Sequence, residues 1–339
     1  MKKKFLSKIF LIFLLIIIFA YLCFSDNGLI DFIKNPSRLN LSWLLFGFLC
    51  QIANIIIDAI LTHKFLSNIN PKISFKNALI CGLIGQFYCA VTPSASGGQP
   101  MQIYAMSQRN IKAGITTSAL VQKFLIYQIS LVIYFATIII LKTDYISSLN
   151  PAVHLILIVG FLIQVLCMVV LIVFSLNKSS TEKIINVFYE ILNKLKFIKN
   201  SGEKIQKIQH HVNLFHQSNS YLLKSKKFVL EVFMLTFIQL TFIFLIPYCV
   251  YKSFNLPNHP IIDLISAQTF VTMASSFFPI PGASGAAEGA SSIFLSPYFG
   301  ETTIKSAIVV CRIINYYFTI IATAPFAKLT KQAKKNPSL

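Results

Sequence analysis

The sequence predicts an all-α polytopic membrane protein with about six full spans and two re-entrant helical hairpins in inverted repeats. Of its 339 residues, 55% are hydrophobic and 12% are charged, whereas a soluble domain carries about 25% charged residues. Uncharged apolar runs recur along the whole chain, and two shorter ones end in a Pro-x-Ala-Ser-Gly break. This composition excludes a soluble enzyme, and we interpret residues 1–339 as a single transmembrane domain.

The full spans follow from the length of the apolar runs. A helix that crosses a hydrocarbon core of ~30 Å needs about 20 apolar residues. Runs of this length cover residues 5–24, 41–63, 113–141, 153–176, 228–251 and 302–326. No small-residue cleavage site follows the first run, so we expect an uncleaved helix there rather than a signal peptide. The shorter runs at 77–92 and 261–278 are then the first halves of the two hairpins.

The distribution of basic residues predicts the orientation. If each hairpin re-enters on the side from which it came, the first hairpin and the second hairpin open to opposite sides of the membrane. Most of the 30 Lys and Arg residues then fall on the side to which the first hairpin opens. The positive-inside rule makes that side cytoplasmic, and it places both termini there, in a multi-pass protein of the cell membrane. Residues 177–227 hold ten lysines and are predicted to form a basic amphipathic helix on the anionic inner leaflet. A nucleic-acid partner is not needed to explain this charge.

The two breaks indicate an internal duplication. Four of six positions agree between Pro93-Ser-Ala-Ser-Gly-Gly98 and Pro281-Gly-Ala-Ser-Gly-Ala286, at an offset of 188 residues. A second match occurs at the same offset, where Ser118-Ala-Leu-Val121 aligns with Ser306-Ala-Ile-Val309. The first repeat covers about 77–141 and the second about 261–326. Oppositely oriented repeats with interrupted helices are typical of transporters that bind their substrate near the midplane.

Four charged residues fall inside predicted spans or beside a tip. Lys123 and Arg312 each lie ten residues into a span, about 15 Å deep at 1.5 Å per residue. Glu288 follows the second break, and Asp58 shares its span with two amides. Charge inside a membrane is costly, so each is a functional hypothesis with an expected partner. Two simpler interpretations remain open: the tips are tight loops between packed helices, and the cations are structural partners of Glu288 and Asp58.

The sequence offers no sign of a cofactor, a metal site or a catalytic residue. Its seven cysteines contain no Cys-x-x-Cys pair, and its six histidines show no metal-ligand spacing. The glycines at 97 and 98 are not followed by Gly-Lys-Ser/Thr, so they do not form a nucleotide-binding loop. We therefore expect neither a metal nor ATP hydrolysis.

Two motifs carry a family resemblance. The stretch Gly85-Gln-Phe-Tyr…Thr92-Pro-Ser-Ala-Ser-Gly-Gly-Gln-Pro-Met-Gln-x-Tyr104 resembles a signature of the lysylphosphatidylglycerol synthase transmembrane-region family. Phe278-Pro-Ile-Pro-Gly-Ala-Ser-Gly-Ala-Ala-Glu288-Gly resembles its second signature. In multiple peptide resistance factors of this family, this region is the flippase part. The resemblance implies outward movement of lysyl-phosphatidylglycerol, lipid metabolism and resistance to cationic antimicrobial peptides.

We expect the lipid substrate to contact both tips and the intramembrane charges. Lys123 and Arg312 would hold the phosphate, and Glu288 and Asp58 would either balance those charges or hold a cationic headgroup. The remaining candidates are the tip residues Pro93, Ser94, Ser96, Gly97, Gly98, Gln99, Gln102, Tyr104, Pro281, Gly282, Ser284 and Gly285.

Two other functions stay open at this point. The family name implies a phosphatidylglycerol lysyltransferase, although the chain ends at Leu339 and the cytosolic synthase domain of the longer proteins is expected to be absent. Alternatively, the chain is the membrane subunit of a separately encoded synthase or other lipid-modifying enzyme. The expected partners are membrane lipids, such an enzyme, and a second copy of the chain as a homo-oligomer.

Overall fold

A computed structural model describes residues 39–179, 183, 216, 225–276 and 278–330. The described residues form helices and contain no strand. The first predicted span, 5–24, and most of the predicted amphipathic segment 177–227 lie outside the described residues. The prediction of an all-helical membrane protein is confirmed, while the count of six spans stays a prediction.

Five helices of the described part are long and apolar enough to cross a membrane. They match the predicted spans to within a few residues at each end, except that the last one begins earlier. Asn40 and Asn150 each accept a backbone hydrogen bond at a helix start, which explains two of the boundaries. The five are α3 (Leu41–Ile69), α6 (Ala113–Leu141), α8 (Pro151–Leu176), α11 (Lys226–Ser253), and the continuous path of α14 (Ser296–Arg312), η4 (Ile313–Tyr317), α15 (Phe318–Ala327) and η5 (Lys328–Thr330).

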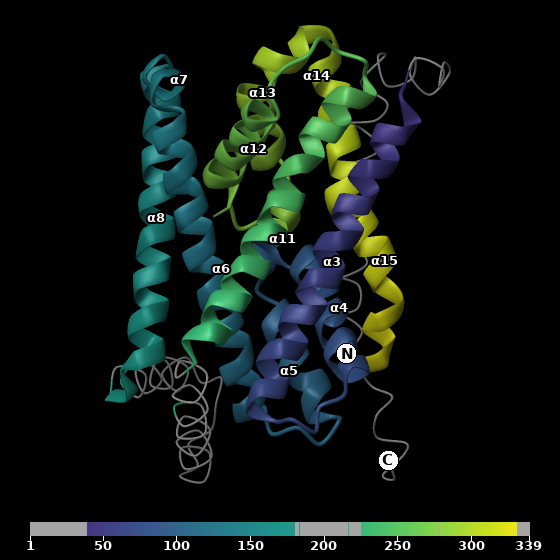
Figure 1. The fold of residues 1–339 in the computed structure, drawn as a ribbon, viewed down its shortest axis with the longest axis vertical. Coiled ribbons are helices and arrows are strands. Elements are labelled where there is room, and N and C mark those ends of the chain that lie inside the picture. Colours follow the sequence, from purple (N-terminus) through teal and green to yellow (C-terminus); the bar gives the residue numbers. More distant parts are fainter. Residues whose placement is uncertain (1–38, 180–182, 184–215, 217–224, 277, 331–339) are drawn as a thin grey trace, which may run out of the picture.

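Two shorter helical hairpins enter from opposite ends of the molecule (Figure 1). The first consists of α4 (Phe75–Val91), the turn η2 (Pro93–Ala95) and α5 (Gly98–Ser107). The second consists of α12 (Ile261–Ser275), η3 (Pro281–Ala283) and α13 (Ala286–Phe294). Each runs about halfway along the long axis and returns, and the turns η2 and η3 touch each other. The short helix α7 (Thr143–Ser147) connects α6 to α8.

The two tips share one backbone conformation as far as Ala95 and Ala283, and they differ at the Ser-Gly pair that follows. Thr92 and Ile280 are extended, with φ near −119° in both. After the proline, Ser94 and Ala95 have φ of 49° and 53°, and Gly282 and Ala283 have φ of 62° and 50°. Positive φ is strained for residues with a side chain, so the same unusual turn occurs at both matched motifs.

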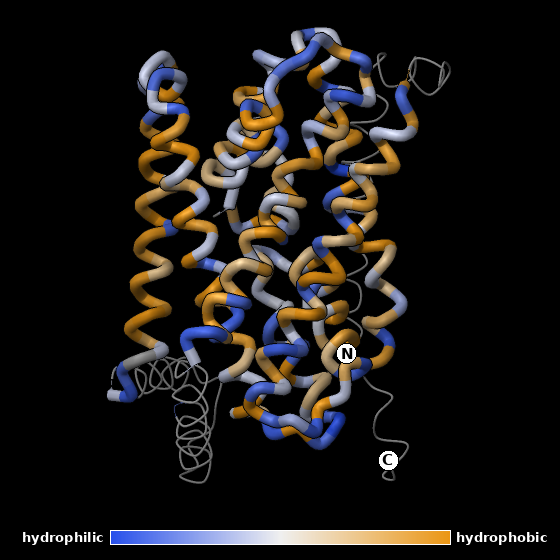
Figure 2. The backbone as a smooth tube through the Cα atoms, in the orientation of Figure 1, coloured by the Kyte–Doolittle hydropathy of each residue, from blue (hydrophilic) through white to orange (hydrophobic). Residues whose placement is uncertain are grey.

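The middle of the molecule is mostly apolar (Figure 2). The charged residues are distributed unevenly between the two ends. One end holds the carboxyl ends of α3, α5, α8 and α15 and carries Lys64, Lys72, Lys76, Arg109, Lys112, Lys178, Lys226, Lys227 and Lys328 with Glu231. At the opposite end, Lys142, Lys252 and Lys305 are balanced by Asp144, Asp263 and Glu301. This asymmetry has the form that the positive-inside rule requires.

Polar contacts and small residues hold the outer helix α8 against α6 and α12. Gln122 donates a hydrogen bond to Ser175 at 2.7 Å, and Gln128 bonds to Gln164, so two amides of α6 face α8. At Gly160, a Cβ atom would lie 2.5 Å from the Met273 carbonyl oxygen, which brings α8 against α12. Small residues and interhelical hydrogen bonds are the usual means of packing helices in lipid.

We expect Gly98→Ala to destabilise the first hairpin. A Cβ atom at Gly98 would lie 2.1 Å from Cys89 Sγ and 3.0 Å from the Gly85 carbonyl oxygen, so α5 would have to move away from α4. Overpacking of this kind costs about 1–3 kcal/mol. Thermal unfolding in detergent measures the loss. Gly289→Ala is the matched control, because a Cβ atom there meets nothing within 4 Å, and an equal loss in both variants would contradict the close packing.

Candidate functional site

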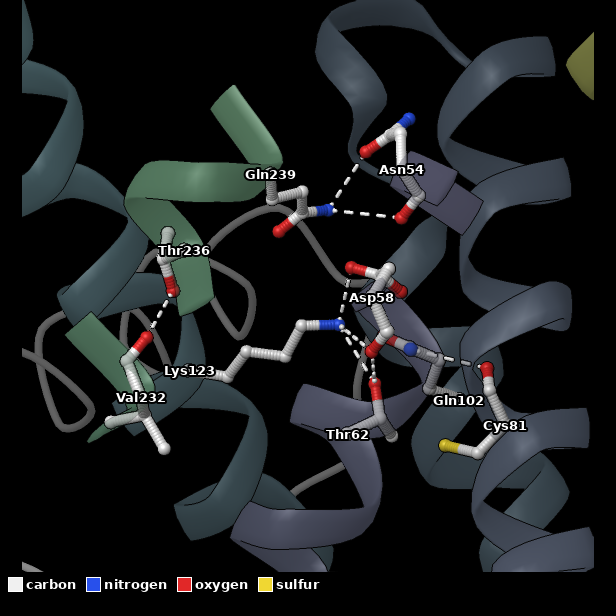
Figure 3. A network of polar contacts seen from close by, with 9 residues as sticks. All are labelled: Asn54, Asp58, Thr62, Cys81, Gln102, Lys123, Val232, Thr236 and Gln239. Atoms are coloured by element: carbon white, nitrogen blue, oxygen red, sulfur yellow. Dashed lines mark hydrogen bonds and ion pairs between the residues drawn. The ribbon is translucent and has the colours of Figure 1, made fainter. Parts of the chain in front are cut away.

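Lys123 and Asp58 form an ion pair deep between the helices. Lys123 Nζ on α6 lies 2.6 Å from Asp58 Oδ1 on α3, and each side chain is 16% exposed. The same Nζ donates to Thr62 Oγ1 at 2.8 Å and to the Asp58 carbonyl oxygen at 3.3 Å (Figure 3). A paired and hydrogen-bonded charge costs far less in an apolar environment than an isolated one. The partner predicted for Lys123 is therefore present.

Amide side chains continue the polar contacts along α3. Asn54 accepts a hydrogen bond from Gln239 Nε2 of α11 at 2.9 Å (Figure 3). One turn further, Gln51 donates to Thr319 Oγ1 at 2.6 Å and to the Asn315 carbonyl oxygen at 3.2 Å. Gln51, Asn54 and Asp58 are spaced three and four residues apart, so they lie on one face of α3. Through these hydrogen bonds, the polar face of α3 contacts both α11 and the last span.

A cavity of about 290 Å³ lies beside the Lys123–Asp58 pair. Its walls come from α3, both arms of the first hairpin, α6 and α11. Leu120, Phe124 and Tyr127 form an apolar side. Gly85 permits the close approach of Gln102, because a Cβ atom would lie 2.4 Å from that amide. The polar lining consists of Asp58, Lys123, Gln86, Gln99, Gln102, Thr236 and Gln239.

Arg312 and Glu288 form a second buried pair, which fastens the tip of the second hairpin. Arg312 Nε lies 2.8 Å from Glu288 Oε1, with side chains 12% and 17% exposed. Arg312 Nη1 donates to the Gly282 carbonyl oxygen at 2.9 Å, and Glu288 Oε2 accepts from the Gly285 amide at 2.6 Å. Arg312 Nη2 is buried and has no hydrogen-bond acceptor among the described residues. This pair therefore has an unused donor.

Tyr316 connects the two hairpin tips. It lies in the π-helical turn η4, an irregularity that is frequently found at functional sites. Its hydroxyl donates to the Ala90 carbonyl oxygen at the end of α4 at 2.9 Å. Its ring lies against Gly282, where a Cβ atom would come within 2.3 Å, and the Arg312 guanidinium is 5.4 Å from the ring centroid. One side chain thus contacts both tips and the buried arginine.

The structure divides the predicted site residues into two groups. Asp58, Lys123, Gln99 and Gln102 meet at the cavity. The second group surrounds η3: Pro281, Gly282, Ser284, Gly285, Glu288 and Arg312. The cations therefore do not share one pocket, and each is paired with an acid, as the simpler structural interpretation proposed.

The remaining predicted residues lie on the first hairpin. Pro93, Ser94 and Ser96 are exposed at its tip, and the Gly97 amide donates to Thr92 Oγ1 at 2.9 Å. Gly98 is buried against α4. Tyr104 is 43% exposed and lies outside the cavity lining. Whether any of these residues contacts a substrate stays a prediction.

Sequence reasoning missed Gln86, Gln239, Tyr127 and Tyr316. Gln239 was detectable in principle, because a glutamine inside an apolar span usually has a polar partner. The π-helical turn that positions Tyr316 had no clear sequence signal. Among the described residues, no group of three His, Cys, Asp or Glu side chains could hold a metal ion. Paired charges, amides and an apolar wall suit reversible binding of a polar group.

Residues 8–323 match the family model described as the lysylphosphatidylglycerol synthase TM region. The chain belongs to this family. It is also similar to a UPF0104 membrane protein of Archaeoglobus fulgidus, with 26% identity over 297 residues, covering 84% of this chain and 85% of the relative. The family resemblance of the two Pro-x-Ala-Ser-Gly motifs is thereby confirmed. In this family member, both motifs lie at the tips of half-length hairpins.

We expect Asp58→Asn and Lys123→Gln each to lower stability by about 3–5 kcal/mol, because each leaves one buried charge without a partner. The double variant should lose less than the sum of the single losses. Thermal or denaturant unfolding in detergent gives the coupling energy.

The pair Lys64–Glu231 serves as the control cycle, because its side chains are 29% and 50% exposed. Exposed pairs contribute about 1 kcal/mol or less. Equal coupling in the two cycles would argue against a desolvated pair at Lys123.

We expect Gly282→Ala to destabilise the protein strongly in the wild-type background and less in a Tyr316→Leu background. The substitution would press a Cβ atom into the Tyr316 ring and also place alanine at a φ of 62°. Removing the ring relieves the clash but leaves the backbone strain. The measurement is the unfolding temperature of the four proteins, and strict additivity would contradict the contact.

Proposed function

We propose that this chain moves a phospholipid between the leaflets of the cell membrane. The observation that carries the proposal is the polar cavity with its Lys123–Asp58 pair, next to the place where two hairpin tips meet. Pro93 and Ser94 of η2 are exposed, and η2 contacts η3 of the second hairpin. Irregular backbone at membrane depth is tolerated only where it is buried in protein or lines a wet cavity. A cavity that admits a lipid headgroup satisfies this requirement.

The proposed orientation places the basic end in the cytoplasm. The end that carries Lys64, Arg109 and Lys328 has a large excess of positive charge, and the opposite end is balanced. Both chain termini would then be cytoplasmic, as the sequence predicts. In this orientation the first hairpin and its cavity are reached from the inner leaflet, and the second hairpin faces outward.

We infer that the two hairpins are inverted repeats whose relative rocking exposes the headgroup site alternately. The matching backbone of the tips and the contact between η2 and η3 support this idea. Lys123 would bind the phosphate first. Arg312, with its unused Nη2 donor, would bind it on the outward side. The acyl chains would stay in the lipid while the headgroup crosses.

The family name suggests lysyl-phosphatidylglycerol as a related lipid. Its transport by this chain, and a part in resistance to cationic antimicrobial peptides, are predictions. Lysyl transfer and assembly with a separate synthase also stay predictions.

Purified protein in liposomes with fluorescent phosphatidylglycerol in the inner leaflet tests the proposal. We expect the outer leaflet to gain label faster than in protein-free liposomes. The double variant Asp58→Asn with Lys123→Met should lose most of this activity, because it removes both charges without stranding either.

Lys64→Met is the matched control, since it removes a lysine of the same helix bundle that lies at the basic end and outside the cavity. It should retain transport. A wild-type rate equal to that of empty liposomes would refute the proposed function, and full activity in the double variant would refute the role of the cavity.

A further inference from the structure

An apolar groove lies between α6 and α11, away from the cavity. Its volume is about 410 Å³, which is within the range of about 300–1,000 Å³ that is usual for ligand sites. The described residues that line it are Ile126 and Ile129 of α6 with Lys226, Val229, Leu230 and Phe233 of α11. The lining thus combines an apolar surface with one cation.

The cation lies at one end of the groove. Residues 226, 229, 230 and 233 are spaced by three, four and seven positions, so they share one face of α11. Lys226 is the first residue of this helix, and Phe233 lies about 10 Å further along the axis at 1.5 Å per residue. Because α11 begins at the basic end of the molecule (Figure 1), the lysine lies at that end and the apolar lining continues toward the middle. A phospholipid has the same layout, with a phosphate at the membrane surface and an acyl chain below it.

The charge of Lys226 is not neutralised within the described part of the chain. Its ammonium has no ion pair or hydrogen bond there, and the side chain is exposed. Glu231, the nearest acid along α11, is paired with Lys64 of α3 at 2.6 Å and does not line the groove. Lys227 adds a second exposed cation, and the N-terminus of a helix carries positive partial charge. An anion is therefore favoured at this end of the groove.

The groove is separate from the cavity beside the Lys123–Asp58 pair. The two sites share no lining residue, because they use different faces of α6 and α11. One turn before Ile126, Gln122 donates to Ser175 of α8 at 2.7 Å. The groove thus continues the face of α6 that turns toward α8. A molecule bound in the groove would contact neither member of the ion pair.

The membrane supplies a ligand of matching chemistry. In the proposed orientation, the basic end lies at the cytoplasmic leaflet, whose anionic lipids attract lysines near the surface. Leu230 is 62% exposed, so its face of α11 is open to an acyl chain. A zwitterionic lipid would fill the apolar part equally well, but it would bring its own cationic group to a lining that contains no described acid. The charge therefore selects an anionic phospholipid.

We propose that this groove holds one anionic phospholipid as a resident lipid, distinct from the lipid that is transported. The phosphate binds the Lys226 ammonium. One acyl chain lies along Val229, Leu230 and Phe233, against the isoleucines of α6. Both helices also form walls of the cavity, so the resident lipid lies directly behind the transport site. This inference does not rest on lipid transport.

Quenching of a single tryptophan by brominated lipids tests the site in a bilayer. The chain has one tryptophan, Trp43, near the start of α3. Trp43→Phe with Leu230→Trp therefore places the only reporter in the groove, at a position exposed enough to accept an indole ring. We expect brominated phosphatidylglycerol to bind there about fivefold more strongly than brominated phosphatidylcholine, which is the factor that one lysine contributes near an anionic surface.

Further variants show whether Lys226 causes this preference. Lys226→Met in the reporter background should reduce the preference to less than twofold. Lys72→Met is the matched control and should keep it, because Lys72 is an exposed lysine of the same end outside the groove. A second reporter, Met234→Trp with Trp43→Phe, lies one turn further along α11, where Met234 is 50% exposed and outside the lining. It should bind the two lipids equally.

Native mass spectrometry gives the same test without a reporter. In detergent with equal amounts of both lipids, the wild-type chain should retain one phosphatidylglycerol, and Lys226→Met should retain at least threefold less. Asp58→Asn with Lys123→Met alters the cavity and leaves the groove lining intact. This double variant should retain the lipid as the wild type does.

Three results would overturn the inference. The first is equal binding of the two lipids at the Leu230→Trp reporter, which would indicate ordinary surrounding lipid. The second is a preference that survives Lys226→Met. The third is loss of the retained lipid in the Asp58→Asn with Lys123→Met variant but not in Lys226→Met, which would assign that lipid to the cavity. Lipid transport is measured separately in liposomes, so its failure would leave this test intact.

Discussion

The cost of charge in a hydrocarbon environment is the constraint on which the rest of this structure depends. A cation at membrane depth must find an acid and additional hydrogen-bond partners. Lys123 finds Asp58 and Thr62, and Arg312 finds Glu288 and the Gly282 carbonyl oxygen. These contacts fix α3 against α6, and the second tip against the last span. The polar centre therefore also determines how the helices pack.

The half-length hairpins impose a related requirement on the backbone. A hairpin that turns back at mid-depth exposes peptide groups that a continuous helix would satisfy internally. Here the chain meets the requirement with local bonds, such as Gly97 to Thr92, and with long-range ones, such as Tyr316 to Ala90. Small residues allow these contacts, since Gly98 and Gly282 leave no room for a Cβ atom. The first tip is thus held partly by Tyr316 of the other half, and the second tip by Arg312 of its own half.

The two halves resemble each other in backbone but differ in the use of their charges. The first half leaves a cavity beside its cation, whereas the second half uses its arginine to fasten its own tip. The ligand proposed for this site is a membrane lipid, in keeping with membership of the lysylphosphatidylglycerol synthase TM region family. In the proposed transport cycle, one half of the molecule binds the headgroup while the other half closes behind it. The single unused donor on Arg312 is the exception, and it lies where the two halves meet.

The sequence by itself determined the five spans of the described part, the two hairpins and the identity of the buried charges. These depend on local properties: the length of an apolar run, a proline and glycine break, or a lysine among leucines. It also carried the family, through two motifs at matched positions. Only the tertiary structure decided that Lys123 pairs with Asp58, that Arg312 pairs with Glu288, and that the cavity lies beside one cation alone. Gln239 and Tyr316 entered the site for the same reason. Pairing between helices depends on their rotation and tilt, which are set by side-chain packing across the whole bundle and not by any local pattern.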